Sequence, residues 1–159
     1  MIILLFGILG VLWFGVFKKE LLKHNGEIVY LELSPVDPRS LIQGDYMQLS
    51  YRIERGQNFS DLREPKHIIV GINHRRVAHF ERADDGGALD RDERRIRVKI
   101  LNGHLRIVPR SFLFQEGQAK DYEHARYGVF RVDESGNHLL VDLADKQREL
   151  ITPHQVNKS

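Results

Sequence analysis

Residues 95–100 read Arg95-Ile96-Arg97-Val98-Lys99-Ile100, in which three β-branched residues alternate with three cations. A period of two places the apolar side chains on one face of a β-strand and the charged side chains on the other. Asn102-Gly103 follows, and this pair suits the positive backbone torsions of a tight hairpin turn. The stretch therefore predicts two antiparallel strands, at 94–101 and 104–108, with one face buried and the other in water.

The same period of two recurs on both sides of this hairpin. The other expected strands are residues 27–33, 46–53, 67–72, 76–81, 128–132 and 138–143. One short helix is expected over residues 116–126, which contain several helix-favouring residues and lie just before Gly128. We therefore predict a mainly β, antiparallel domain of about eight strands and one short helix over residues 27–152. A flexible tail is expected at residues 153–159.

The N-terminal seventeen residues, 1–17, contain no charged side chain and are followed at once by Lys18, Lys19 and Glu20. A helix of this length reaches about 25 Å, and continuing it to Leu22 brings it close to the roughly 30 Å hydrocarbon core of a bilayer. The lysine side chains can keep their ammonium groups at the head-group level. We therefore predict a single transmembrane anchor at residues 1–22, with the lipid bilayer as its partner.

Two alternatives to a transmembrane anchor remain open. A cleaved signal peptide would need a basic start and a small-x-small cleavage site, and neither is evident around residues 1–17. A buried core helix would show at least a narrow polar stripe with a helical period, and this is missing as well. The anchor is therefore the preferred interpretation.

Composition excludes several classes of function. The 24 Lys and Arg residues and 22 Asp and Glu residues all follow residue 17 and are mixed in clusters such as residues 90–95, which favours a solvated face over a nucleic-acid-binding stripe. The absence of cysteine excludes disulfides, zinc-thiolate sites and thiol nucleophiles. The eight histidines include no helical pair of the zinc-hydrolase kind, although a site shared by His74, His79 and Asp84 is conceivable. We expect no metal, no cofactor and no nucleic-acid partner.

The most distinctive motif is residues 44–51, which read Gly-Asp-Tyr-Met-Gln-Leu-Ser-Tyr. Gly44 permits a positive φ where the chain turns into a strand, and Asp45 can accept amide hydrogens that the turn leaves free. Along that strand Leu49 and Tyr51 share one face, whereas Tyr46 lies on the other. The motif is thus interpreted as a corner between two strands.

A short leader, Asp37-Pro38-Arg39, precedes the motif. Pro38 fixes its own φ and biases Asp37 towards an extended conformation. Arg39 is close enough in sequence to pair with Asp37 or Asp45. Carboxylates grouped in this way are also candidates for acid-base chemistry.

The pattern G-D-Y-x-x-L-x-Y resembles the bacterial GDYXXLXY protein family, which is named after it. Further matches lie at Phe114-Gln115-Glu116-Gly117 and at Ala125-Arg126-Tyr127-Gly128. The residues that carry the resemblance, and that are the candidate site, are Asp37, Pro38, Arg39, Gly44, Asp45, Tyr46, Leu49, Tyr51, Glu116 and Gly117.

The resemblance implies a protein of the bacterial inner membrane with a single anchor and a periplasmic C-terminal domain. Members of the family are often encoded near multi-pass membrane proteins, and no activity is established for the family as a class. Lys18, Lys19 and Lys23 would instead favour a cytoplasmic domain by the positive-inside rule. The two indications conflict, and the orientation stays open at this point.

Several functional hypotheses follow from the sequence, among them a ligand carrier, which would require an apolar cavity that the sequence does not show. The preferred one is a non-enzymatic accessory or interaction module for a multi-pass membrane partner. The alternative is a small hydrolase that uses the corner of Asp37, Arg39, Asp45 and Tyr46. A serine protease built on Ser34 or Ser40 would need a lysine whose pKa is lowered by burial, and Lys66 is expected at the edge of a strand.

Overall fold

The structure is a computed structural model that describes Trp13, Gly15, Phe17 and residues 19–34, 42–43, 45–56 and 67–154. Strands are the main regular secondary structure of these residues. In chain order the elements are β1 (Glu27–Glu32), β2 (Ile42–Gln43), β3 (Tyr46–Gln48), the 3₁₀ turn η1 (Arg52–Glu54), β4 (His67–Ile72), β5 (Ala78–Ala83), β6 (Glu93–Arg97), β7 (Lys99–Leu101), β8 (His104–Arg106), β9 (Ser111–Leu113), α3 (Ala119–Tyr122), β10 (Tyr127–Val132) and β11 (His138–Ala144). The prediction of a mainly β domain with one short helix is confirmed within these residues.

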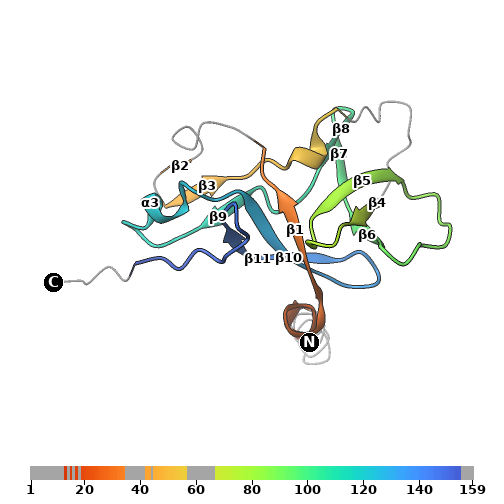
Figure 1. The fold of residues 1–159 in the computed structure, drawn as a ribbon, viewed down its shortest axis with the longest axis horizontal. Coiled ribbons are helices and arrows are strands. Elements are labelled where there is room, and N and C mark those ends of the chain that lie inside the picture. Colours follow the sequence, from red (N-terminus) through yellow and green to blue (C-terminus); the bar gives the residue numbers. More distant parts are fainter. Residues whose placement is uncertain are drawn as a thin grey trace, which may run out of the picture.

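The strands form small antiparallel sheets around one hydrophobic core (Figure 1). Their orders are β1-β10-β11, β2-β3-β9 and β5-β4-β6, with β7 and β8 forming a separate pair. The first and third sheets are linked through a bridge between Tyr30 and Val77, and the first sheet is linked to the end of the motif through a bridge between Leu33 and Tyr51. Segments far apart in the sequence therefore meet at β1.

The hairpin expected at Asn102-Gly103 is confirmed. Leu101 pairs with His104, and the two turn residues have φ values of 52° and 75°. Its first strand, however, is not continuous over 94–101. Pairing with β4 ends at Arg97, whose amide donates to the carbonyl of Gly136 at 2.9 Å. The following strand, β7, pairs with β8 instead.

The strand expected over residues 46–53 is wrong beyond Gln48. Leu49 still donates its amide to the carbonyl of Arg110, next to β9, at 2.8 Å. Ser50 then accepts the amide hydrogen of Ser34 at 2.7 Å and Tyr51 bridges Leu33, so the chain turns from β9 to the segment that follows β1. It then enters η1, where the amide of Glu54 donates to the carbonyl of Tyr51 at 3.0 Å. This bend brings Tyr51 into the core and buries Glu54.

The helix expected over residues 116–126 is reduced to α3. Gly117 has a φ of 88°, outside the helical region, and therefore precedes the helix. At the other end the amide of Arg126 donates to the carbonyl of Ala144 at 2.8 Å, so sheet pairing replaces the helix before β10. The sequence analysis also missed β2 and β9, which have two and three residues and are too short to show a period.

The clusters of mixed charge form ion pairs on the β5-β4-β6 sheet. Arg95 contacts both carboxylate oxygens of Asp84, at 2.6 and 3.1 Å, and this hydrogen bonding holds the pKa of Asp84 below its usual value. Arg82 pairs with Glu93, and Arg94 pairs with Glu27 of β1 at 2.6 Å. The pair of Arg94 and Glu27 links the β5-β4-β6 sheet to the start of the β1-β10-β11 sheet.

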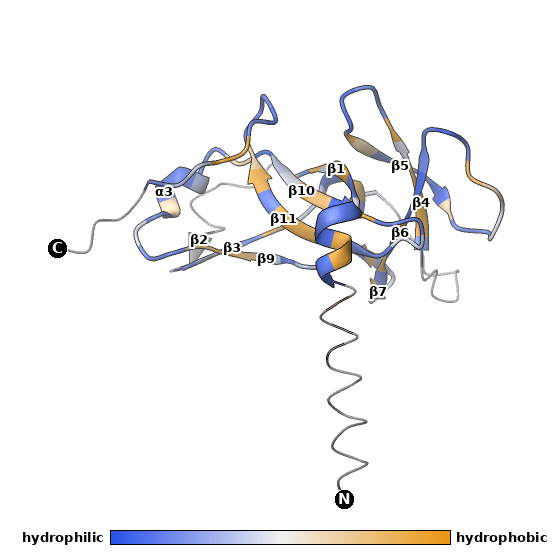
Figure 2. Ribbon diagram, turned by 90° about the horizontal axis from the view of Figure 1, so that it is seen from below, coloured by the Kyte–Doolittle hydropathy of each residue, from blue (hydrophilic) through white to orange (hydrophobic). Residues whose placement is uncertain are grey.

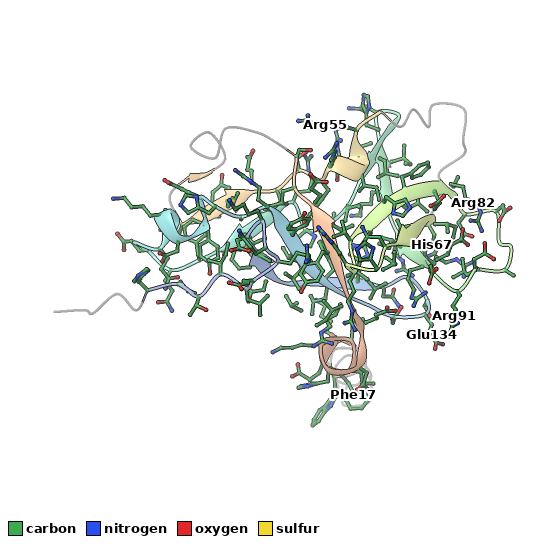
Figure 3. All side chains as sticks on the ribbon, viewed as in Figure 1. Phe17, Arg55, His67, Arg82, Arg91 and Glu134 are labelled. Carbon is green, nitrogen blue, oxygen red and sulfur yellow. The ribbon has the colours of Figure 1, made fainter. Side chains whose placement is uncertain are left out.

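The chain is helical over residues 19–25 and also at Trp13, Gly15 and Phe17. Figure 2 shows this helix leaving one side of the β-domain, and in Figure 3 Phe17 lies on the side of the helix away from the sheets. The described part of the helix is not long and apolar enough to cross a membrane. Most of the anchor expected at residues 1–22 lies outside the described residues.

Candidate functional site

The second half of the motif is buried in the core. Leu49 is 2% exposed and Tyr51 is fully buried, whereas Tyr46 is only half-buried. The expectation that Leu49 and Tyr51 share a face opposite to that of Tyr46 agrees with this pattern. The two apolar positions of the motif therefore point inward, where they meet a distant part of the chain.

That distant part is residues 107–110, between β8 and β9. The hydroxyl of Tyr51 donates to the carbonyl of Pro109 at 2.8 Å, and the amide of Leu49 donates to the carbonyl of Arg110. A carboxylate oxygen of Glu54, Oε1, accepts the amide hydrogen of Ile107 at 2.7 Å. Three groups from residues 49–54 thus hold three main-chain atoms of this loop.

A fourth hydrogen bond reaches the same loop from β11. Nε2 of His138 lies 2.9 Å from the carbonyl oxygen of Val108, the residue that precedes the cis peptide bond to Pro109. Burial lowers the pKa of His138, which favours the neutral ring. Each of the four residues 107–110 therefore has a main-chain hydrogen bond to another element, and we call this arrangement the loop clamp.

Aromatic packing supports the loop clamp. The ring of Tyr51 meets that of Phe130 edge-on with centroids 5.5 Å apart, and Phe130 meets His138 at the same distance. A Cβ on Gly128 would lie 3.0 Å from Phe130 and 3.2 Å from Tyr51. Gly128 therefore leaves the space that the rings of Tyr51 and Phe130 fill. This is a packing role for the glycine that ends the segment Ala125-Arg126-Tyr127-Gly128.

Glu54 is the buried charge of the clamp. Its side chain is 1% exposed, and Nη1 of Arg106 lies 3.7 Å from Oε2, beyond hydrogen-bond distance. Oε2 has no hydrogen-bond partner among the described residues. Burial raises the pKa of Glu54, and the amide of Ile107 opposes this shift only in part.

The buried phenol is shifted in the same direction. Burial, and then the nearby Glu54 carboxylate, raise the pKa of Tyr51. Its hydroxyl therefore stays protonated and acts as a hydrogen-bond donor. A side chain that reacts with a substrate must contact it, and neither Tyr51 nor Glu54 reaches the surface. This burial favours a structural role for the second half of the motif.

Asp45, near the start of the motif, lies at the surface. Gln43 pairs with Tyr46, so two residues connect β2 to β3. Asp45 is exposed, and its carbonyl accepts the amide hydrogen of Phe114 at 3.0 Å. Asp37, Pro38, Arg39 and Gly44 lie outside the described residues. The hydrolase hypothesis, which needs Asp37 and Arg39, therefore stays a prediction, as does the pairing of Arg39 with a carboxylate.

The other two candidate residues precede α3. Glu116 is exposed, and Gly117 provides the positive φ before the helix. α3 and η1 lie at separate places in the domain (Figure 1), so Glu116 is not brought to the loop clamp. Gln118 fixes the local structure instead, because its side chain accepts the amide hydrogen of Gln115 and donates to the carbonyl of His154.

The possible metal site at His74, His79 and Asp84 does not form. His79 pairs with Glu81 at 2.7 Å, whereas Asp84 pairs with Arg95. Within the described ranges, no group of three or more histidine and acidic side chains is arranged to hold a metal ion. Ser34, one of the protease candidates, is buried, and Ser40 and Lys66 lie outside these ranges.

Sequence reasoning missed three members of the clamp, namely Glu54, Phe130 and His138. Their partners lie 53, 79 and 30 residues away along the chain, as seen for Glu54 with Ile107, Phe130 with Tyr51 and His138 with Val108. No local pattern marks such contacts. The only available indication was an acidic residue shortly after a strongly apolar strand.

Comparison with known proteins identifies a family. The model of the GDYXXLXY protein family matches residues 8–143, which include the whole motif, the clamped loop and both segments quoted around Gly117 and Gly128. No curated protein and no solved structure matches the chain. Since the matched residues make up most of the sequence, the chain belongs to the GDYXXLXY protein family.

Proposed function

We propose that this protein is a membrane-anchored envelope protein whose β-domain is a non-enzymatic accessory or interaction module. Residues 1–22 form its anchor in the bacterial inner membrane, and the β-domain lies in the periplasm beside a multi-pass membrane partner. The domain provides a rigid surface for contact rather than a reaction centre.

The observation that carries this proposal is the apolar face of the N-terminal helix. Trp13, Phe17 and Leu21 follow one another at intervals of four residues and are 75%, 52% and 44% exposed. Residues at this spacing share one face of a helix. Large apolar side chains in such a row favour an apolar environment, and the charge-free residues 1–17 extend the same character. Lys19 and Lys23, both exposed, suit the head-group level.

The loop clamp supports the non-enzymatic part of the proposal. The most characteristic side chains of the motif, those of Leu49 and Tyr51, are used to hold a loop and to fill the core. This leaves the exposed Asp45 for contact with a partner. An interaction module needs such a fixed surface, and it does not need an acid-base pair open to solvent.

The anchor and its orientation are tested with a single cysteine, because the natural sequence contains none. Lys146→Cys places a thiol at an exposed position in the turn after β11. We expect a membrane-impermeant maleimide to label it in intact spheroplasts, and we expect the chain to stay in the membrane pellet after carbonate washing. Labelling only after lysis would contradict the periplasmic location, and recovery of the intact chain in the carbonate supernatant would contradict the anchor.

Asp45→Asn tests whether the exposed half of the motif contacts a partner. The carboxylate of Asp45 is at the surface, and the hydrogen bond from Phe114 uses the main-chain carbonyl, so we expect a stability change below about 0.5 kcal/mol. The full-length variant should accumulate normally but recover less of the multi-pass partner after purification in mild detergent. Asp92→Asn, an exposed change in another loop, is the matched control.

Two results would contradict the partner hypothesis. Repeated purification of the wild-type protein without a companion would remove the basis for an accessory role. An unstable Asp45→Asn variant would show instead that Asp45 is a structural residue of the corner.

A further inference from the structure

The connection between the helix and β1 is short and closely packed. The amide of Gly26 donates to the carbonyl of Leu22 at 2.9 Å, and the guanidinium of Arg131 in β10 donates to the carbonyl of Gly26 at 2.8 Å. A Cβ on Gly26 would lie 2.6 Å from the carbonyl oxygen of Leu22 and 2.9 Å from the Cβ of Arg131. Helix and domain therefore meet without a flexible linker, and the direction of the helix fixes the orientation of the domain.

This orientation places one sheet on the side where the helix leaves. In Figure 2 the β2-β3-β9 sheet lies below β10 and β11, near the lower end of the helical ribbon. The same view shows α3 above this sheet. Figure 2 also draws β7 on this side, so a membrane crossed by the helix would face both β7 and the lower face of β2-β3-β9.

The side chains of β9 alternate across this sheet. Phe112 packs on Tyr122 of α3 with ring centroids 5.2 Å apart, so it faces the core side. Leu113 is the next residue in the strand, points to the opposite face and is 76% exposed. It pairs with Tyr46 of the motif across the strands, so these two side chains share the outer face.

We propose that this outer face rests on the head-group region of the bilayer at its β9 edge, where Leu113 lies. The inference rests on the proposed anchor and adds a second contact, made by the β-domain itself. A leucine beside a tyrosine suits the boundary between head groups and acyl chains, where the apolar body of tyrosine and its hydroxyl are both satisfied. Lys19 and Lys23 on the adjoining helix would bring anionic head groups to the same level.

The test uses the full-length chain carrying Leu113→Cys, labelled with an environment-sensitive fluorophore and reconstituted into vesicles of phosphatidylethanolamine and phosphatidylglycerol. The matched control is Lys146→Cys, in the turn after β11, which Figure 2 places on the upper side of the domain. We expect the label at 113 to show a blue-shifted emission and to be quenched by lipids that carry a spin label near the head group. The label at 146 should show neither effect.

Flotation of the same vesicles separates the two proposals. If the chain floats with the lipid but the label at 113 reports water, as the label at 146 does, the contact of the sheet with the bilayer is wrong while the anchor remains. If the chain does not float, the anchor is wrong and this inference fails with it. Leu113→Glu gives a second check, because it should leave flotation intact and should abolish quenching of a label placed at the neighbouring Ser111→Cys.

Discussion

Tyr51→Ala is expected to lower the free energy of unfolding by about 3–5 kcal/mol, because it removes a fully buried aromatic side chain and leaves a cavity. It also leaves the carbonyl of Pro109 without its donor and removes the edge contact with Phe130. Tyr51→Phe keeps the ring and deletes only the hydroxyl, so we expect a loss of about 1–3 kcal/mol. Chemical denaturation of the full-length chain in detergent micelles, followed by the far-ultraviolet circular dichroism of the β-domain, measures both.

Tyr127→Phe is the matched control for the loss of a hydroxyl. Tyr127 is partly exposed and meets Tyr30 edge-on across the sheet, away from the loop at 107–110. We expect a change below about 0.5 kcal/mol. Equal stabilities for Tyr51→Phe and the wild type would show that the hydrogen bond to Pro109 does not hold the loop.

Glu54→Ala is expected to destabilise the protein by about 1–3 kcal/mol, because the amide of Ile107 loses its acceptor in a buried place. Glu54→Gln keeps an oxygen for that amide and removes the charge. Since burial raises the pKa of Glu54 in the folded state, the ionised carboxylate carries a cost that the glutamine variant avoids. The glutamine variant should therefore be more stable than the alanine variant at neutral pH.

The same shift predicts how stability changes with pH. The pKa of Glu54 is raised from its ordinary value of 4.5, so the folded protein binds this proton more tightly than the unfolded chain does. The stabilising contribution of the proton is complete below pH 4.5 and is lost as the pH rises through the folded pKa. Glu54→Gln should accordingly gain stability relative to the wild type as the pH is raised from 4.5 towards neutrality.

Glu81→Gln, which removes a surface carboxylate, controls for the loss of a negative charge as such. The urea midpoints of the three proteins are compared at matched pH values. A stability difference between Glu54→Gln and the wild type that does not change with pH would contradict the assignment of Glu54 as a carboxyl with a raised pKa.

The strands were predictable where a period of two met a turn of distinctive chemistry. Residues 67–72 were expected as a strand and form β4, because β-branched side chains pack on both faces of that sheet. The hairpin at Asn102-Gly103 was predictable for a related reason, since both residues adopt positive φ values there.

The bend after Gln48 was not predictable, because alternation continues through Leu49 and Tyr51 while the backbone changes partner. The new backbone partner is the segment after β1, where Leu33 bridges Tyr51 and the amide of Ser34 donates to the carbonyl of Ser50. The side chains of Tyr51 and Glu54 then bond to Pro109 and Ile107, more than fifty positions away in sequence. The strand break at Val98 has the same kind of cause, namely the bond from Arg97 to the carbonyl of Gly136. A periodic pattern reports which face is apolar, and it does not report where a strand exchanges one neighbour for another.

The candidate site was predictable only in part for the same reason. The sequence placed Leu49 and Tyr51 on one face, and both are buried as that arrangement requires. Glu54 and His138 could not be assigned to the same place, because each reaches the clamped loop from an element that sequence alone does not bring near it.

The hydrogen bonds of the loop clamp reach only main-chain atoms of residues 107–110. The amide of Ile107 and the carbonyl oxygens of Val108, Pro109 and Arg110 are the groups that are held, and the side chains of Val108 and Arg110 are exposed. The course of the backbone therefore does not depend on the identity of the side chains at positions 108 and 110. Either side chain can therefore be replaced while the framework beneath it stays constant, so this short stretch can change what it presents to solvent without altering its shape.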